Sequence, residues 1–247
     1  EDAGADAETA EAQIMIKETI NRLNNELPAT VKLVAVSKFH PFESIEQAYQ
    51  AGQKAFGESR PQELLAKVRR LEEIRIERGE PDYMSDVEWH FIGHLQTNKL
   101  KMVLPYASLV QSVDSVRLLE AIDKWGRDNG KVINVLLECH VAAEESKQGF
   151  SEAELTEFLS SDRHYPNVKI CGIMGMATFT DDMDIVRADF QRLLDRRNLL
   201  HEWKCKSPNV TSSSDELSMG MSDDYPLAIE MGSTIVRVGS MIFGERY

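Results

Sequence analysis

The stretch Lys32-Leu33-Val34-Ala35-Val36-Ser37-Lys38 decides the fold class of this 247-residue chain. Its apolar part is short, continuous and rich in valine, as is typical of parallel strands that are covered on both faces. Similar short runs recur along the whole chain and alternate with longer amphipathic segments. The eight predicted strands are 32–36, 54–56, 88–92, 108–111, 132–138, 168–172, 216–218 and 234–238.

Helical segments are expected between these strands. The predicted helices are 42–51, 61–78, 98–104, 115–129, 151–160, 181–202 and 223–231. Eight strands alternating with helices fit a (β/α)₈ barrel or an open doubly wound sheet, and the strand count favours the barrel. We therefore expect an α/β protein: one TIM-like barrel over 11–247, including an additional helix at 11–27, preceded by a mobile acidic N-terminus at 1–10.

Charge and cysteine content narrow the function classes. The formal net charge of −13 argues against non-specific binding to nucleic acid or to an anionic membrane surface. No apolar run is long enough for a membrane span, and the acidic start lacks the features of a signal peptide. Cys139, Cys171 and Cys205 form no CxxC pair, and the first two lie in apolar runs, which indicates buried thiols. We expect a cytoplasmic protein that binds neither nucleic acid nor membrane.

Lys38 is the first candidate functional residue, because it follows the first predicted strand at its C-terminal end. In α/β barrels that end of the strands carries the active site. Apolar surroundings lower the pKa of a lysine amine and help it to attack an aldehyde. The alternative is a lysine that extends from the barrel rim into water.

A candidate phosphate site lies after the last two predicted strands. Ser222 follows strand 216–218 and is expected to cap the helix that begins at Asp223, while Gly239 and Ser240 follow strand 234–238. Barrels most often bind phosphate in these two loops, with backbone N–H groups and hydroxyls as donors. The acidic side chains of Asp223 and Asp224 argue against this site if they face the phosphate, and ordinary turn chemistry is the alternative for the glycines.

Arg237 lies within an apolar strand, where a charged side chain needs a partner. That partner is either a structural carboxylate or an atom of a ligand. His90 and His94 do not predict a metal site, because the segment reads as a strand followed by a glycine turn and no third ligand is nearby. His140 is expected at the barrel rim.

Several stretches resemble a known family. They are Leu33-Val34-Ala35-Val36-Ser37-Lys38, Phe56-Gly57-Glu58, the run from Trp89 to Lys99, Cys171-Gly172-Ile173-Met174, the run from Leu217 to Ser222, and the run from Gly232 through Gly244. On these stretches the chain resembles the pyridoxal-phosphate homeostasis proteins, which share the fold of the N-terminal domain of alanine racemase. They occur in the expected order over almost the whole chain.

This resemblance implies a barrel of pyridoxal 5′-phosphate (PLP) fold type III that holds PLP as a Schiff base on Lys38. It also implies that Ser222 and the backbone of Gly239 and Ser240 bind the phosphate, and that Arg237 faces the pyridine nitrogen. Ser59 and the tripeptide Glu138-Cys139-His140 depart from the commoner family pattern, at positions where contacts to the ring edge are expected.

The resemblance further implies a carrier that buffers PLP and supplies it to apo-enzymes, without a catalytic residue. The alternative is a PLP-dependent amino-acid racemase or lyase. Racemisation needs a second acid/base, which a β-rich domain helps to provide in alanine racemase, and we expect no such domain after Tyr247. A guanidinium from Arg237 at the ring nitrogen would also weaken the ring as an electron sink. A cofactor-free phosphosugar barrel is disfavoured because it leaves Lys38 and Arg237 without roles.

Overall fold

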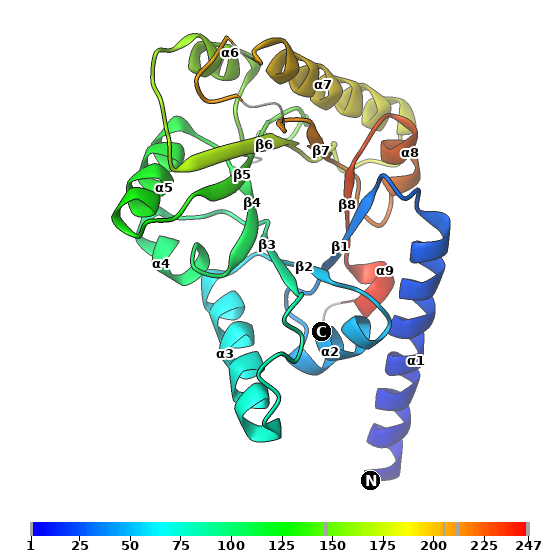
Figure 1. The fold of residues 1–247 in the computed structure, drawn as a ribbon. Helices are drawn as coiled ribbons and strands as arrows, with labels where there is room; N and C mark the ends of the chain where they lie inside the picture. Colours follow the sequence, from blue (N-terminus) through cyan, green and yellow to red (C-terminus); the bar gives the residue numbers. More distant parts are fainter. Residues whose placement is uncertain (1, 146–147, 205, 211–212, 246–247) are drawn as a thin grey trace.

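The computed structural model describes residues 2–145, 148–204, 206–210 and 213–245, so that Cys205 lies outside the described part. In that part, eight parallel strands close into a barrel in sequence order, with β8 paired to β1 (Figure 1). The strands are β1 (Lys32–Val36), β2 (Ala55–Glu58), β3 (Glu88–Phe91), β4 (Ala107–Val113), β5 (Ile133–Glu138), β6 (Val168–Met174), β7 (Glu216–Ser218) and β8 (Ile235–Val238). The predicted (β/α)₈ barrel is confirmed.

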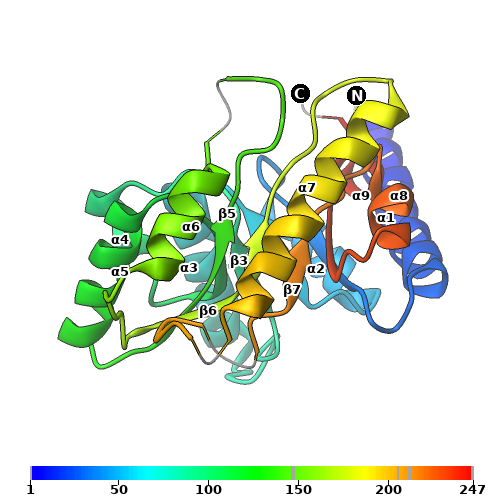
Figure 2. The same cartoon turned by 90° about the horizontal axis from the view of Figure 1, so that it is seen from above.

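Helices surround the barrel and cover its outer face (Figures 1 and 2). They are α1 (Asp2–Glu26), α2 (Phe42–Gln50), α3 (Pro61–Arg78), α4 (Leu100–Val103), α5 (Val116–Asp128), α6 (Glu152–Ser160), α7 (Met183–Glu202), α8 (Tyr225–Glu230) and α9 (Ser240–Phe243), with a 3₁₀ turn η1 (Thr97–Lys99) before α4. Of the helices described, none has the length and apolarity that crossing a bilayer requires.

The largest differences from the sequence prediction concern α1 and α9. Helix α1 begins at Asp2 instead of Glu11, because the alanine- and glutamate-rich start has high helix propensity. Whether residues 1–10 are mobile stays a prediction. Helix α9 was not predicted, because its four residues are too few to show a helical period.

Alternation along the strands sorts side chains between the barrel interior and its outer layer. On β1, Leu33 and Ala35 join the large apolar core between strands and helices, whereas Val34 joins a smaller cluster. The other members of that smaller cluster come from five other strands: Ala55, Leu109, Leu136, Met174 and Ile235. The smaller cluster therefore marks the barrel interior, and the same alternation directs Lys32 and Val36 inward.

Candidate functional site

A pocket of about 180 Å³ lies at the C-terminal mouth of the barrel. All five residues proposed from the sequence as cofactor ligands line it, namely Lys38, Ser222, Arg237, Gly239 and Ser240. They come from the ends of β1 and β8 and from the loop after β7, which lie at three well-separated places in the sequence. Barrel closure, which pairs β8 with both β1 and β7, brings them together. Their role as ligands remains a proposal.

Lys38 is half-buried and lies two residues beyond the end of β1. Val36 at the end of β1 and Lys38 in the turn that follows both line the pocket. The pocket wall around them includes the apolar side chains of Ile92, Met174 and Met176. The amine therefore lies in a partly desolvated place at the barrel mouth, where a flat apolar ring could pack beside it.

The two candidate phosphate-binding loops meet in this pocket. The hydroxyl of Ser240 donates to that of Ser222 over 3.3 Å. Ser222 does not cap helix α8, because that helix begins at Tyr225 and its N-cap residue is Asp224. The expected capping role is thus wrong, and the Ser222 hydroxyl is left at the pocket wall. A Cβ on Gly239 would lie 3.1 Å from Val36 Cβ, so glycine allows β8 to approach β1 closely.

The two aspartates after Ser222 have different positions. Asp224 Oδ1 accepts a hydrogen bond of 2.7 Å from the backbone N–H of Met221, which ties this carboxylate into the turn. Asp223 is exposed and lines the pocket. Its negative charge opposes a phosphate there, and water screens much of this effect because the side chain is exposed.

Arg237 is 4% exposed, and neutral partners hold its guanidinium. It donates to Ser218 Oγ over 2.6 Å and to the carbonyl oxygen of Gly175 over 2.9 Å. Burial lowers the pKa of Arg237 to about 10, and the negative charges of Glu138 and Asp224 oppose that shift. The group is therefore protonated at neutral pH and cannot take up a further proton from a ligand.

A line of hydrogen bonds runs from Arg237 into the barrel interior. Ser218 accepts from Arg237 and donates to Gln111 Oε1 over 2.6 Å, and Gln111 Nε2 lies 2.9 Å from His90 Nδ1. In this arrangement Gln111 Nε2 donates and Nδ1 of a neutral His90 accepts. Burial lowers the pKa of His90, which favours the neutral imidazole. The sequence showed only isolated polar residues in apolar strands and gave no sign that they are joined.

Glu138 lies at the end of β5 and is 7% exposed. Burial and, to a lesser extent, the charge of Asp114 raise its pKa to about 7, and the positive charge of Arg237 opposes the shift. Of the positions that depart from the family pattern, Ser59 lines the pocket directly. Glu138 acts on the pocket through its charge on Arg237.

His140 is half-buried after β5, and its backbone N–H donates to the carbonyl oxygen of Phe150.

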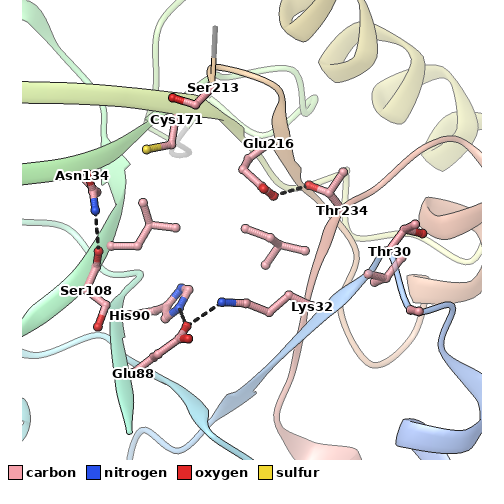
Figure 3. A pocket seen from close by; sticks show the side chains of 14 residues that line it. Thr30, Lys32, Glu88, His90, Ser108, Asn134, Cys171, Ser213, Glu216 and Thr234 are labelled. Atoms are coloured by element: carbon pink, nitrogen blue, oxygen red, sulfur yellow. Dashed lines mark hydrogen bonds and ion pairs between the residues drawn. The ribbon is translucent and has the colours of Figure 1, made fainter. Parts of the chain in front are cut away.

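A larger cavity of about 590 Å³ lies at the opposite, N-terminal mouth of the barrel (Figure 3). Several of its polar groups are paired with one another: Lys32 with Glu88 over 2.6 Å, His90 with Glu88 over 3.4 Å, and Thr234 with Glu216 over 2.6 Å. Hydrogen bonds from His90 and then from Lys32 lower the pKa of Glu88 to about 2. The N-terminal face of such barrels generally serves stability, and these pairs agree with that role.

The remaining sequence expectations concern cysteines and metals. Cys139 is buried, and burial raises the pKa of its thiol to about 12. Cys171 is only half-buried and lines the N-terminal cavity, so the expectation of a buried thiol is wrong there. Within the described ranges, no three His, Cys, Asp or Glu side chains form a group that could hold a metal ion.

Comparisons with known proteins agree with this architecture. The family model of the alanine racemase N-terminal domain matches residues 14–247. A pyridoxal phosphate homeostasis protein from Aquifex aeolicus is 38% identical over 216 residues, which cover 87% of each chain. One from Homo sapiens is 37% identical over 239 residues, covering 94% of this chain and 82% of that relative.

Solved structures give the same result. PipY from Synechococcus elongatus, whose structure holds PLP, has a TM-score of 0.78 and 32% identity, covering 93% of this chain and all of PipY (100%). Alanine racemase from Corynebacterium glutamicum has a TM-score of 0.62 at 16% identity, covering 96% of this chain and 60% of the racemase, which shows a shared fold. The protein is thus an alanine-racemase-like barrel. The chain belongs to the pyridoxal phosphate homeostasis protein family.

Proposed function

We propose that this protein binds PLP at the C-terminal mouth of its barrel and acts in PLP homeostasis as a carrier or buffer. The observation that carries the proposal is that Lys38, two loop hydroxyls and a buried arginine line one pocket. The names of the relatives and the PLP-bound structure of PipY support it.

The donor set of the pocket fits the chemical groups of PLP. When bound, PLP supplies an aldehyde that forms a Schiff base with a primary amine. Lys38 provides the amine, and the hydroxyls of Ser222 and Ser240, with the backbone of Gly239 and Ser240, provide donors for the phosphate. The apolar side chains of the pocket wall suit the ring, and Arg237 provides a donor for the pyridine nitrogen.

Arg237 favours a carrier over an enzyme. Its guanidinium is fixed by Ser218 and Gly175 and stays protonated at neutral pH, so it can only donate to the ring nitrogen. An unprotonated ring nitrogen is a weaker electron sink, which limits carbanion chemistry without forbidding it. The release of PLP to an apo-enzyme, by contrast, needs only exchange at the Lys38 amine. Delivery to apo-enzymes and a cytoplasmic location are parts of this proposal.

The test compares transfer with turnover. Holo-protein is mixed with an apo-PLP enzyme, and recovery of that enzyme's activity is timed against spontaneous release of PLP. In parallel, holo-protein is incubated with L- and D-amino acids while chirality and keto-acid formation are followed. Transfer faster than spontaneous release, without turnover, supports the carrier. Turnover in the range of ordinary enzymes, about 1–10³ s⁻¹, that is lost in Lys38→Ala would overturn it.

A further inference from the structure

The residues on both sides of Lys38 are hydrogen-bonded to one group of charged side chains, formed by Glu58, Glu63 and Lys67 and called here the anchor cluster. Ser37 donates through Oγ to Glu58 Oε1 over 2.6 Å and accepts from Lys67 Nζ at its carbonyl oxygen over 2.8 Å. The backbone N–H of Phe39 donates to Glu63 Oε1. The chain is therefore fixed immediately before and after the lysine.

The anchor cluster is unusually well buried for a group of charges. The side chains of Glu58, Lys67 and Glu63 are 0%, 7% and 20% exposed. Lys67 uses its ammonium group on three acceptors, which are Ser37 O, Glu58 Oε1 and Glu63 Oε1. Burial raises the pKa of Glu58, and the positive charge of Lys67 opposes that shift. Charges this deep are costly to desolvate, so their placement behind the pocket needs a reason beyond stability.

The turn that follows Lys38 gives that reason. Phe39 has φ = 67°, a left-handed conformation that is strained for a residue with a side chain. The bond from its N–H to Glu63 holds this turn, while Ser37 N–H continues the β1–β2 ladder by donating to Gly57 O over 3.0 Å. The direction in which the Lys38 side chain leaves the backbone is set by these two fixed neighbours.

We propose that the anchor cluster positions Lys38 for bond formation with an aldehyde in the pocket, an inference that rests on the proposed function. In that step the Lys38 nitrogen forms the C=N bond, and the aldehyde oxygen leaves as water with the two amine protons. The reaction needs no oxidant or reductant. Glu58, Glu63 and Lys67 act as positioning residues, because they hydrogen-bond to the two neighbours of Lys38 and do not line the pocket.

The experiment uses two ligands that differ only at the reacting carbon. PLP can bond to Lys38, whereas pyridoxine 5′-phosphate carries an alcohol in place of the aldehyde and binds non-covalently. In Lys67→Met and in Glu63→Ala, we expect PLP affinity and the rate at which the Schiff-base absorption band appears to fall about tenfold. The affinity for pyridoxine 5′-phosphate should change less than about twofold, because the phosphate-binding loops are untouched.

Two further variants separate positioning from general stability. Glu63→Gln keeps an oxygen that accepts from Phe39 N–H, and it should restore most of the rate that Glu63→Ala loses. Asp189→Asn is the matched control: Asp189 is 2% exposed and holds Thr178 and Arg192 near the same barrel mouth, away from β1. It should lower stability without a selective effect on PLP.

Selective loss of PLP binding in the cluster variants, with rescue in Glu63→Gln, supports the inference. Equal losses for both ligands, or no loss for either, overturn it and leave the proposed function intact. If the unmodified protein forms no Schiff base with PLP, the proposed function itself falls, and the positioning role falls with it. Because Glu63 is partly exposed, its variants test the inference even if Lys67→Met does not fold.

Discussion

Ser218 Oγ donates a 2.6 Å hydrogen bond to Gln111 Oε1, joining β7 to β4 across the barrel interior between residues 107 positions apart. The same Ser218 oxygen accepts from Arg237. Arg237 is thus held at the pocket by a neutral polar line instead of a directly hydrogen-bonded carboxylate. The carboxylates of Glu138 and Asp224 act on Arg237 through their charge, while it donates hydrogen bonds to the neutral oxygens of Ser218 and Gly175.

Breaking this line should destabilise the protein. Gln111→Leu keeps the side chain's approximate size but removes the acceptor of the Ser218 hydroxyl proton and the partner of His90 Nδ1, while Ser218 Oγ still accepts from Arg237. Each orphaned polar group costs about 1–3 kcal/mol, so the free energy of unfolding should fall by several kcal/mol. Urea unfolding measures it, with the exposed Asn134→Leu as control, expected within about 0.5 kcal/mol of the wild type. Equal losses of stability in both variants would contradict a stabilising role for the hydrogen bonds of Gln111.

Lys38 is predicted to be the residue that bonds to PLP. Lys38→Ala should remove the visible Schiff-base band while leaving the fold, measured by circular dichroism, unchanged. A borohydride-reduced and digested holo-protein should carry the adduct on Lys38. An adduct found chiefly on another lysine, such as Lys99, would show that the assignment is wrong.

Ser222 is predicted to bind the phosphate. Ser222→Ala removes a hydroxyl that would donate to a charged oxygen, which typically costs about 1.5–3 kcal/mol, or one to two decades in affinity. Affinity for PLP should therefore fall more than affinity for pyridoxal, which has no phosphate. Equal weakening of both ligands would place Ser222 away from the phosphate.

Asp223 is predicted to oppose phosphate binding. Because this exposed carboxylate lines the pocket, Asp223→Asn should tighten PLP binding. The gain should stay below about fivefold at physiological salt and should grow as the ionic strength falls, since exposed charges are screened. Titrations of both proteins at two salt concentrations test this. A gain that does not depend on salt would speak against an electrostatic cause.

Glu138 is predicted to make stability depend on pH. Its pKa is about 7 in the folded protein against 4.5 when unfolded, so the native state binds more protons between these values. Its contribution to stability is therefore present below pH 4.5 and is lost as the pH rises to about 7. Comparison with Glu138→Gln isolates this contribution from that of other groups.

As the pH rises from 4.5 to about 7, Glu138→Gln should become more stable relative to the wild type. The difference between their unfolding free energies should change by at most about 3 kcal/mol. Urea unfolding of both apo-proteins between pH 5 and 8, where most of that range lies, measures the difference. Parallel stability curves would mean that the carboxyl group of Glu138 titrates normally.

Local sequence patterns were enough to predict the strands, the barrel and the place of Lys38. The apolar run of β1 identifies a buried strand, and the end of that run places Lys38 at the C-terminal mouth of the barrel, because both depend on neighbours along the chain. The loops with Ser222 and Gly239 could be proposed for the same reason, since each directly follows a strand. The boundaries of β2 were shifted from 54–56 to Ala55–Glu58, because four residues carry little periodicity.

Tertiary structure alone decided which polar groups meet. Lys67 occupies one position of the buried stripe of α3, between Leu64 and Leu71, and that spacing could have marked it as a buried lysine. No local pattern, however, connects it to Glu58 or to the carbonyl group of Ser37. The same holds for Ser218 and Gln111, whose contact exists only because the closed barrel directs both side chains into one interior. Hydrogen bonds of this kind depend on strand register and barrel closure, which the whole chain determines together.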